Sequence, residues 1–151
     1  MARRPVAWLG AVVLLAEAVG IALLNWFLGL VVDKQDMSLA GLDPHAMTVS
    51  TWIAGLLFGG YLALCAVVLA RTAARDRAPG TFGRVLLISC AVVHGLLGAF
   101  CVGLVGWAAF VFMMVVLGLI VLPLVAYEKK AQREGAAEGD GAPGSGAPQP
   151  A

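Results

Sequence analysis

Residues 6–32 read VAWLGAVVLLAEAVGIALLNWFLGLVV, an apolar run of 27 residues with a single carboxylate, Glu17, near its middle. A helix needs about 20 predominantly apolar residues to cross a bilayer. The apolar region of a cleaved signal peptide is only about 7–15 residues long. We therefore expect this run to be retained as a membrane-spanning helix of an integral membrane protein.

Three further apolar runs follow, at residues 46–70, 82–103 and 107–126. The chain is 61% hydrophobic and 13% charged, with a mean hydropathy of +0.93, whereas soluble domains are about half apolar and about a quarter charged. Gly103, Gly106 and the interfacial aromatic Trp107 favour two helices over one long helix between residues 82 and 126. This pattern predicts an all-α fold, an up-down-up-down four-helix membrane bundle formed by residues 1–127.

The basic residues predict the orientation of this bundle. They fall before the first run, between the second and third runs, and after the fourth: Arg3, Arg4, Arg71, Arg75, Arg77, Arg84, Lys129, Lys130 and Arg133. By the positive-inside rule, all three segments and both termini are predicted to be cytoplasmic. The lipid bilayer is the expected environment. Arginine outnumbers lysine seven to three, which indicates a GC-rich coding sequence and a bacterial plasma membrane.

The composition changes after residue 127. Residues 128–151 begin with charged side chains and continue with glycine, alanine, proline and acidic residues. Such a segment has too little apolar surface to offset the entropy lost on ordering. The sequence therefore predicts a disordered cytoplasmic tail over residues 128–151.

Glu17 and His94 are an acidic and a basic residue near the middle of their apolar runs. Glu17 lies 13 residues after Arg4, and His94 lies 10 residues after Arg84, on two runs that both leave the cytoplasmic side. At a rise of about 1.5 Å per residue the two side chains reach a similar depth, so a Glu17–His94 pair is geometrically possible. Intramembrane ionisable groups are costly, and they pair with one another or line a pathway.

Three roles remain open for this candidate pair. The pair is a structural latch between the first and third helices, or it is a proton- or cation-coupled site, or Glu17 is unpaired or faces a partner. Interhelical polar contacts in membranes contribute only about 0.6 kcal/mol on average. Either of the first two roles is therefore compatible with a modest effect on stability.

The first run also carries a resemblance. Trp8-Leu9, Leu15-Ala16-Glu17-Ala18-Val19-Gly20 and Leu23-Leu24 resemble the first helix of small multidrug resistance transporters. The resemblance implies that Glu17 binds protons and cationic substrates in turn. It covers about 17 residues, and the aromatic, glycine-rich third-helix motif of that family is absent from residues 85–102.

Small residues indicate how the helices pack. Glycine and alanine recur every four residues in the second and third runs, at Gly55, Gly59 and Ala63 and at Ala91, Gly95, Ala99 and Gly103. Such stripes allow helix backbones to approach closely. We expect them to pack the first three helices together or to form a contact with a second copy or another membrane protein.

The sequence gives little support for catalysis. Cys90, His94 and Cys101 share one helix face, but their spacing is not a zinc signature, so no metal or cofactor is predicted. We find no nucleophile–base set, no phosphate-binding loop and no nucleic-acid-binding motif. The sequence therefore favours a non-enzymatic accessory, scaffold or interaction protein. A proton-coupled transporter and a membrane redox protein are the alternatives.

Overall fold

The computed structural model describes residues 3–35, 41 and 43–140, with side chains described as far as residue 136. Within these residues the chain forms four helices: α1 (Arg3–Lys34), α2 (Pro44–Arg75), α3 (Thr81–Leu104) and α4 (Trp107–Asp140). All four are long and apolar enough to cross a membrane. Only 22–33% of the residues in their most apolar windows are buried inside the molecule, so a lipid environment is needed to cover the remainder.

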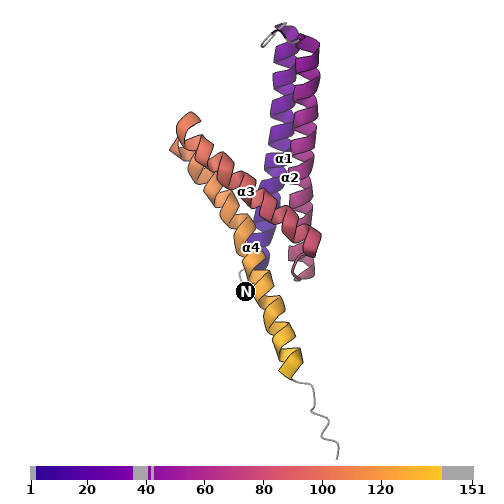
Figure 1. The fold of residues 1–151 in the computed structure, drawn as a ribbon, viewed down its shortest axis with the longest axis vertical. Coiled ribbons are helices and arrows are strands. Elements are labelled where there is room, and N and C mark those ends of the chain that lie inside the picture. The colour runs from indigo at the N-terminus through magenta and orange to yellow at the C-terminus, as the bar shows by residue number, and fades with distance from the viewer. Residues whose placement is uncertain (1–2, 36–40, 42, 141–151) are drawn as a thin grey trace, which may run out of the picture.

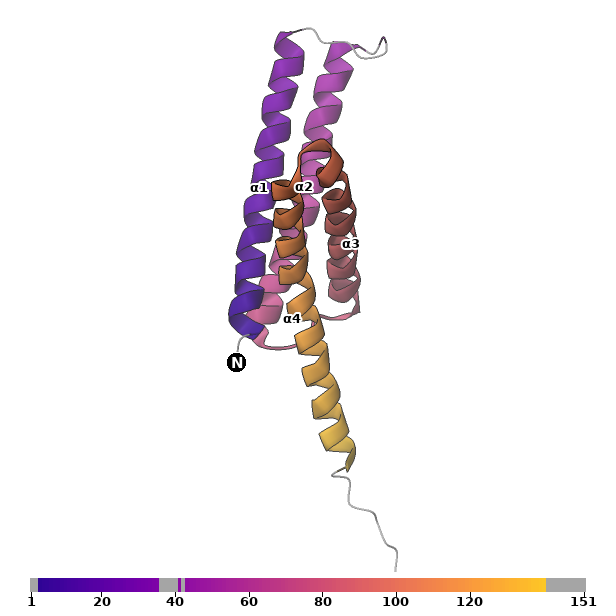
Figure 2. The same ribbon diagram turned by 90° about the vertical axis from the view of Figure 1, so that its left-hand side faces the viewer.

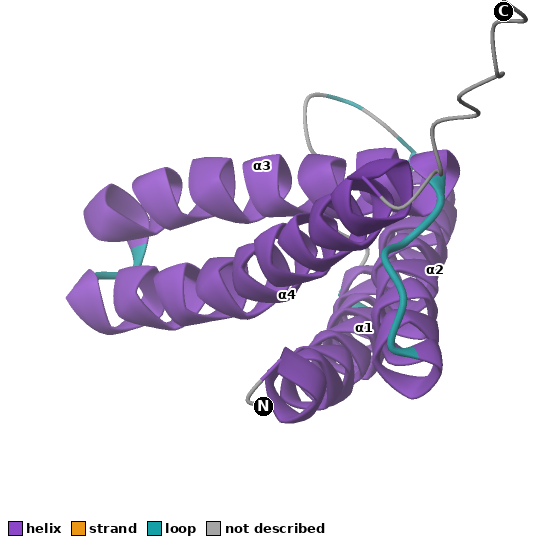
Figure 3. Cartoon of the chain, turned by 90° about the horizontal axis from the view of Figure 1, so that it is seen from below, coloured by secondary structure: helices purple, strands orange, loops and turns teal. Residues whose placement is uncertain are grey.

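The helices associate as two hairpins. Helices α1 and α2 run side by side along their length, and α3 packs against α4 (Figures 1 and 2). In Figure 1 the hairpins cross in the half of the molecule that holds the start of α1 and the α2–α3 connection. They diverge toward their other ends. Seen from below, α3 and α4 lie across the α1–α2 pair (Figure 3).

The core lies where the hairpins cross. All four helices contribute to it, through Ala7, Ala11, Leu14, Leu62, Cys65, Leu69, Leu87, Cys90, Val116, Ile120 and Leu124. Gly10 permits a close approach of three helices, because a Cβ there would lie 2.8 Å from a Leu69 methyl group and 2.9 Å from the Leu119 carbonyl oxygen. The absence of a side chain at this position therefore lets α1 lie against α2 and α4 at once.

Local sequence signals account for the helix ends. Asp43 has extended backbone angles and accepts a hydrogen bond from the Ala46 amide at 3.3 Å, and Pro44 opens α2. This is the N-cap arrangement that Asp-Pro predicts. Between α3 and α4, Gly106 adopts a φ of +117°, which favours glycine, and its amide donates to the Cys101 carbonyl at 2.7 Å. The prediction that residues 82–126 form two helices is confirmed.

Helix α4 is longer than the sequence predicts. Residues 128–140, which we expected to be disordered, continue the helix to Asp140, and Figure 2 shows this end projecting beyond the other helices. Two ion pairs support the extension, Arg84–Glu128 at 2.8 Å and Lys130–Glu134 at 3.7 Å, the latter one helical turn apart. Composition alone does not reveal these two ion pairs. The rest of the predicted tail, 141–151, lies outside the described residues.

Candidate functional site

Glu17 lies on α1 near the crossing of the two hairpins. The turn before it contributes Leu14 to the core, and the residue after it, Ala18, is also buried. The Glu17 side chain is itself 15% exposed. Because α1 is apolar on nearly all sides, this carboxyl group has few polar neighbours other than those supplied by another helix.

His94 supplies that neighbour from α3. It belongs to the buried face of this helix, formed by Gly83, Leu87, Cys90, His94 and Gly98, and its side chain is only 4% exposed. Its Nε2 lies 3.1 Å from the Oε2 of Glu17. The structure thus brings together the two residues that the sequence places at similar depth, and the contact joins one hairpin to the other.

The hydrogen bond of the other ring nitrogen of His94, Nδ1, determines which atoms of the Glu17–His94 pair carry protons. Nδ1 lies 2.8 Å from the backbone carbonyl oxygen of Cys90, and a carbonyl oxygen only accepts hydrogen bonds. Nδ1 must therefore carry a proton and donate it. The contact between Nε2 and Glu17 Oε2 then needs one further proton. The pair is either a protonated Glu17 donating to a neutral His94 or a Glu17 carboxylate accepting from a charged imidazolium.

Both arrangements have the same net charge, because each holds one proton between Oε2 and Nε2. If this proton were lost, a carboxylate oxygen would face the lone pair of a neutral ring nitrogen across 3.1 Å. That arrangement lacks a hydrogen bond and places two acceptors together in an apolar environment, which is costly. The geometry of the site therefore favours binding of a single proton by the pair.

A cavity adjoins the pair. Its volume is about 270 Å³ and all four helices line it, mainly with apolar side chains such as Leu24, Phe58, Leu62 and Phe112. Glu17 and His94 are the titratable residues in its wall. The second carboxyl oxygen of Glu17, Oε1, is buried and has no hydrogen-bond partner within the described part of the chain. One oxygen of Glu17 thus serves the contact with His94, and the other is buried without a partner among the described residues.

The cysteines contribute less than their shared helix face suggests. Cys90 Sγ lies 3.6 Å from His94 Nδ1, and Cys65 Sγ lies 3.9 Å from the Leu86 carbonyl oxygen, so these two buried thiols border the Glu17–His94 pair. Cys101 is half-buried and lies almost two turns beyond His94 along α3. Among the residues whose placement is described, no group of three or more His, Cys, Asp or Glu side chains could hold a metal ion.

The sequence did not predict a second polar contact, which is partly buried. The Tyr61 hydroxyl on α2 lies 2.7 Å from the Ser89 hydroxyl on α3, and Ser89 also donates to the Leu86 carbonyl at 2.8 Å. Both hydroxyls lie inside apolar runs. The sequence feature that could have predicted this contact is depth, since Tyr61 and Ser89 are each a short distance from the same predicted cytoplasmic loop.

The predicted packing residues divide into two groups. Gly55 and Gly59 on α2 face α1, where a Cβ at Gly55 would collide with Asn25 and one at Gly59 would lie 3.0 Å from the Ala18 carbonyl oxygen. Ala63 also packs against the core. These positions serve contacts within the chain.

The stripe on α3 behaves differently. Ala91 is half-buried, and a Cβ at Gly95 would make ordinary contact with Leu117 of α4. Ala99 and Gly103 are exposed, and Gly103 has open space around it. Ala99 and Gly103 therefore do not pack the first three helices together, and a contact of this part of the stripe with a second copy or another membrane protein stays a prediction. The buried face of α3 is instead the one that carries His94, and α3 packs mainly on α4.

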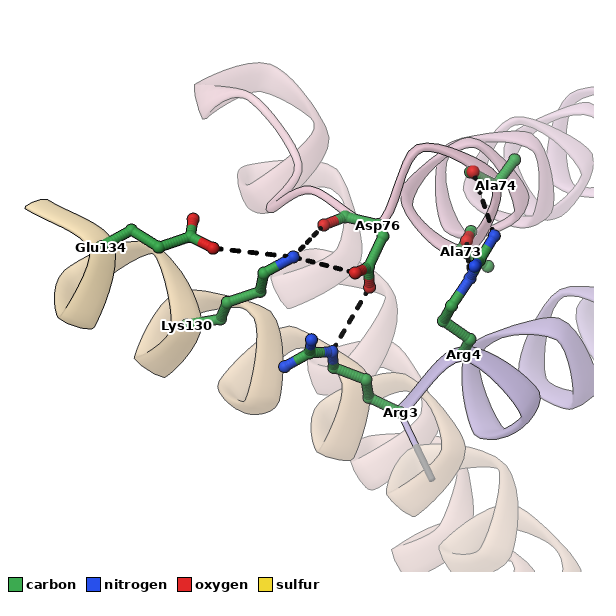
Figure 4. Close-up of polar contacts among 7 residues, drawn as sticks. All are labelled: Arg3, Arg4, Ala73, Ala74, Asp76, Lys130 and Glu134. Atoms are coloured by element: carbon green, nitrogen blue, oxygen red, sulfur yellow. Dashed lines mark hydrogen bonds and ion pairs between the residues drawn. The ribbon is translucent and has the colours of Figure 1, made fainter. Parts of the chain in front are cut away.

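At the end of the molecule where the hairpins cross, a network of charged groups centres on Asp76. Its Oδ1 lies 3.3 Å from Arg3 Nε, and its Oδ2 lies 2.8 Å from Lys130 Nζ (Figure 4). These two cations hold the pKa of the Asp76 carboxyl below its usual range, Lys130 having the larger effect. Asp76 thereby joins the start of α1 and the extension of α4 to the α2–α3 connection.

Comparison with known proteins adds no relative. No protein-family model matches this chain, and neither a curated protein nor a solved structure matches it. The resemblance of residues 8–24 to the first helix of small multidrug resistance transporters therefore has no support from these comparisons.

Proposed function

We propose that the chain is a multi-pass protein of the bacterial plasma membrane, with helices in up-down-up-down order and both termini in the cytoplasm. The contacts around Asp76 support this topology, because they join the start of α1, the α2–α3 connection and the distal part of α4 at one end. The basic residues that define a cytoplasmic surface gather at the same end.

Within this topology, the proposed function is that of a non-enzymatic interaction or accessory protein that works through contacts between helices. The observation that carries this proposal is the Glu17–His94 contact of 3.1 Å, which connects α1 of one hairpin to α3 of the other. The pair acts as a latch that needs one bound proton. Beyond it, the apolar faces of the separated hairpin ends are available to lipid or to the helices of a partner.

Substitutions of Glu17 test the latch. In Glu17→Gln the side-chain amide donates to His94 Nε2 and preserves the bond, whereas Glu17→Leu leaves this buried nitrogen unsatisfied. We expect Glu17→Gln to unfold close to the wild type, and Glu17→Leu to lose about 1–3 kcal/mol, in reversible unfolding experiments in mixed micelles. Equal stability of Glu17→Leu and the wild type would refute the latch.

The unpartnered Oε1 and the adjoining cavity favour a second candidate, proton-coupled transport. Here the proton held between Glu17 and His94 exchanges with a substrate in the cavity. Four helices form a thin wall, so this function requires an oligomer. Glu17→Gln separates the candidates in sealed liposomes, because it preserves the latch but has no exchangeable proton. Proton flux in the wild type that is lost in Glu17→Gln supports transport, whereas no flux in the wild type excludes it.

A further inference from the structure

A second cavity lies at the end where the hairpins cross, away from Glu17 and His94. It has a volume of about 310 Å³ and is formed by the last turns of α2, the α2–α3 connection and the first turn of α3. Three arginines line it, Arg71, Arg75 and Arg77. Val68 and Phe82 add apolar walls, and Phe82 is 71% exposed.

The three arginines differ from most other basic residues at this end. Arg3 and Lys130 bind Asp76, Arg4 donates to the Ala73 carbonyl at 3.2 Å, and Arg84 pairs with Glu128. By contrast, Arg71, Arg75 and Arg77 have no ion pair or side-chain hydrogen bond among the described residues. The cavity therefore concentrates positive charge that the described part of the chain does not neutralise.

Asp76 is the nearest acid in sequence, yet it is not available to these arginines. Both of its carboxylate oxygens are engaged by Arg3 and Lys130 on the side of α1 and α4 (Figure 4). No carboxylate of the described residues lines this arginine-lined cavity, whereas Glu134 lines the neighbouring basic cavity beside α4. Among the described residues, an anion that enters the cavity thus meets three cations and no competing acid.

The backbone adds further donors. Helix α3 begins at Thr81 after Gly80, and no side chain caps it. The first intrahelical bond runs from the Arg84 amide to the Gly80 carbonyl, so the amides of Thr81, Phe82 and Gly83 have no partner within the helix. Gly80, Phe82 and Gly83 line the cavity. Unpaired amides and the positive end of the helix dipole attract phosphate groups.

We propose that this cavity is a binding site for a phosphate group, presented by the headgroup of an anionic membrane lipid. The arginines and the amides of α3 bind the phosphate, and the exposed Phe82 and Val68 provide the apolar surface along which the acyl chains begin. In the proposed topology the cavity faces the cytoplasmic leaflet, where basic residues attract anionic lipids. This inference does not depend on the role of Glu17.

The test is native mass spectrometry of the full chain, released from micelles containing equal amounts of phosphatidylglycerol and phosphatidylcholine. We expect preferential retention of phosphatidylglycerol. Arg71→Gln, Arg75→Gln and Arg77→Gln should each reduce the ratio of bound phosphatidylglycerol to bound phosphatidylcholine by about fivefold. Arg133→Gln is the matched control, because it removes one charge from the same end of the molecule but outside the cavity.

A second arm identifies the source of the phosphate. Excess inorganic phosphate should displace little phosphatidylglycerol, because it lacks the apolar part of the lipid. Equal retention of the two lipids by the wild type would overturn the proposal, and so would equal effects of the cavity substitutions and Arg133→Gln. Binding of inorganic phosphate without a preference for phosphatidylglycerol would overturn the assignment to a lipid. Unchanged melting temperatures in micelles show that the variants remain folded.

Discussion

At the scale of single residues, depth in the membrane was the informative quantity. Counting residues from Arg4 and Arg84 placed Glu17 and His94 at one level, and the structure brings them to 3.1 Å. The sequence could not indicate which ring nitrogen faces Glu17. That depends on the Cys90 carbonyl, which fixes Nδ1 as a donor, and on the rotation of α3, which only packing determines.

Glycine positions provide a sharp test of packing at this scale. Gly59→Ala would place a Cβ 3.0 Å from the Ala18 carbonyl oxygen and force α1 and α2 apart, whereas Gly60 has open space around it. We expect Gly59→Ala to lower the free energy of unfolding by about 1–3 kcal/mol. The matched control Gly60→Ala should be neutral or slightly stabilising. Similar unfolding curves for the two variants in mixed micelles would contradict the observed α1–α2 contact.

At the scale of elements, apolar run length predicted the number of helices and the break at Gly106, whereas composition failed for the end of α4. The segment after residue 127 is polar, but ion pairs between its residues and with Arg84 and Asp76 extend the helix to Asp140. Two of these contacts, Arg84–Glu128 and Asp76–Lys130, join residues distant in sequence. A composition argument that treats each segment separately has no means of finding them.

The Asp76 network predicts a specific pH dependence. Because the pKa of Asp76 is lowered in the folded protein, its contribution to stability is present above the ordinary value of 3.8 and is lost as the pH falls through the lowered pKa. Asp76→Asn removes this contribution but tolerates the left-handed backbone at this position, where φ is 50°. We therefore expect the variant to melt below the wild type at neutral pH.

Lowering the pH distinguishes the contribution of the Asp76 carboxylate charge from a general effect of the substitution on stability. The difference in melting temperature between the wild type and Asp76→Asn should shrink below pH 3.8. Asp33→Asn is the control, because Asp33 is exposed and has no ion pair among the described residues. A difference for Asp76→Asn that persists unchanged at low pH would show that the carboxylate charge is not responsible.

At the scale of the whole molecule, the sequence indicated a membrane protein with four helices but not the crossing of two hairpins. Small residues were expected to pack the first three helices together. Instead Gly10 brings α1 against α4, and α3 packs on α4 while Ala99 and Gly103 remain exposed. A glycine stripe indicates that a close approach is possible. It does not indicate which helix approaches, since that depends on the complementary surfaces of all four.

The proposed topology is tested by labelling intact cells. In a chain whose native cysteines are replaced, a single cysteine at Gln35 should react with a membrane-impermeant maleimide from outside. One at Arg133 should react only after permeabilisation. The reverse pattern would place the basic end outside and contradict the proposed orientation. Reaction of both positions in sealed cells would contradict the four-span arrangement.

The coupling between Glu17 and His94 is measured most directly by a double-mutant cycle on Glu17→Leu and His94→Phe. The free energies of unfolding are obtained from reversible unfolding in mixed micelles at neutral pH. If Glu17 and His94 form the proton-dependent latch between the hairpins, each single substitution destabilises the protein. The double variant then loses less than the sum, with a coupling of about 0.6–1.7 kcal/mol. Strictly additive losses, or no loss from either substitution, would contradict a latch between Glu17 and His94.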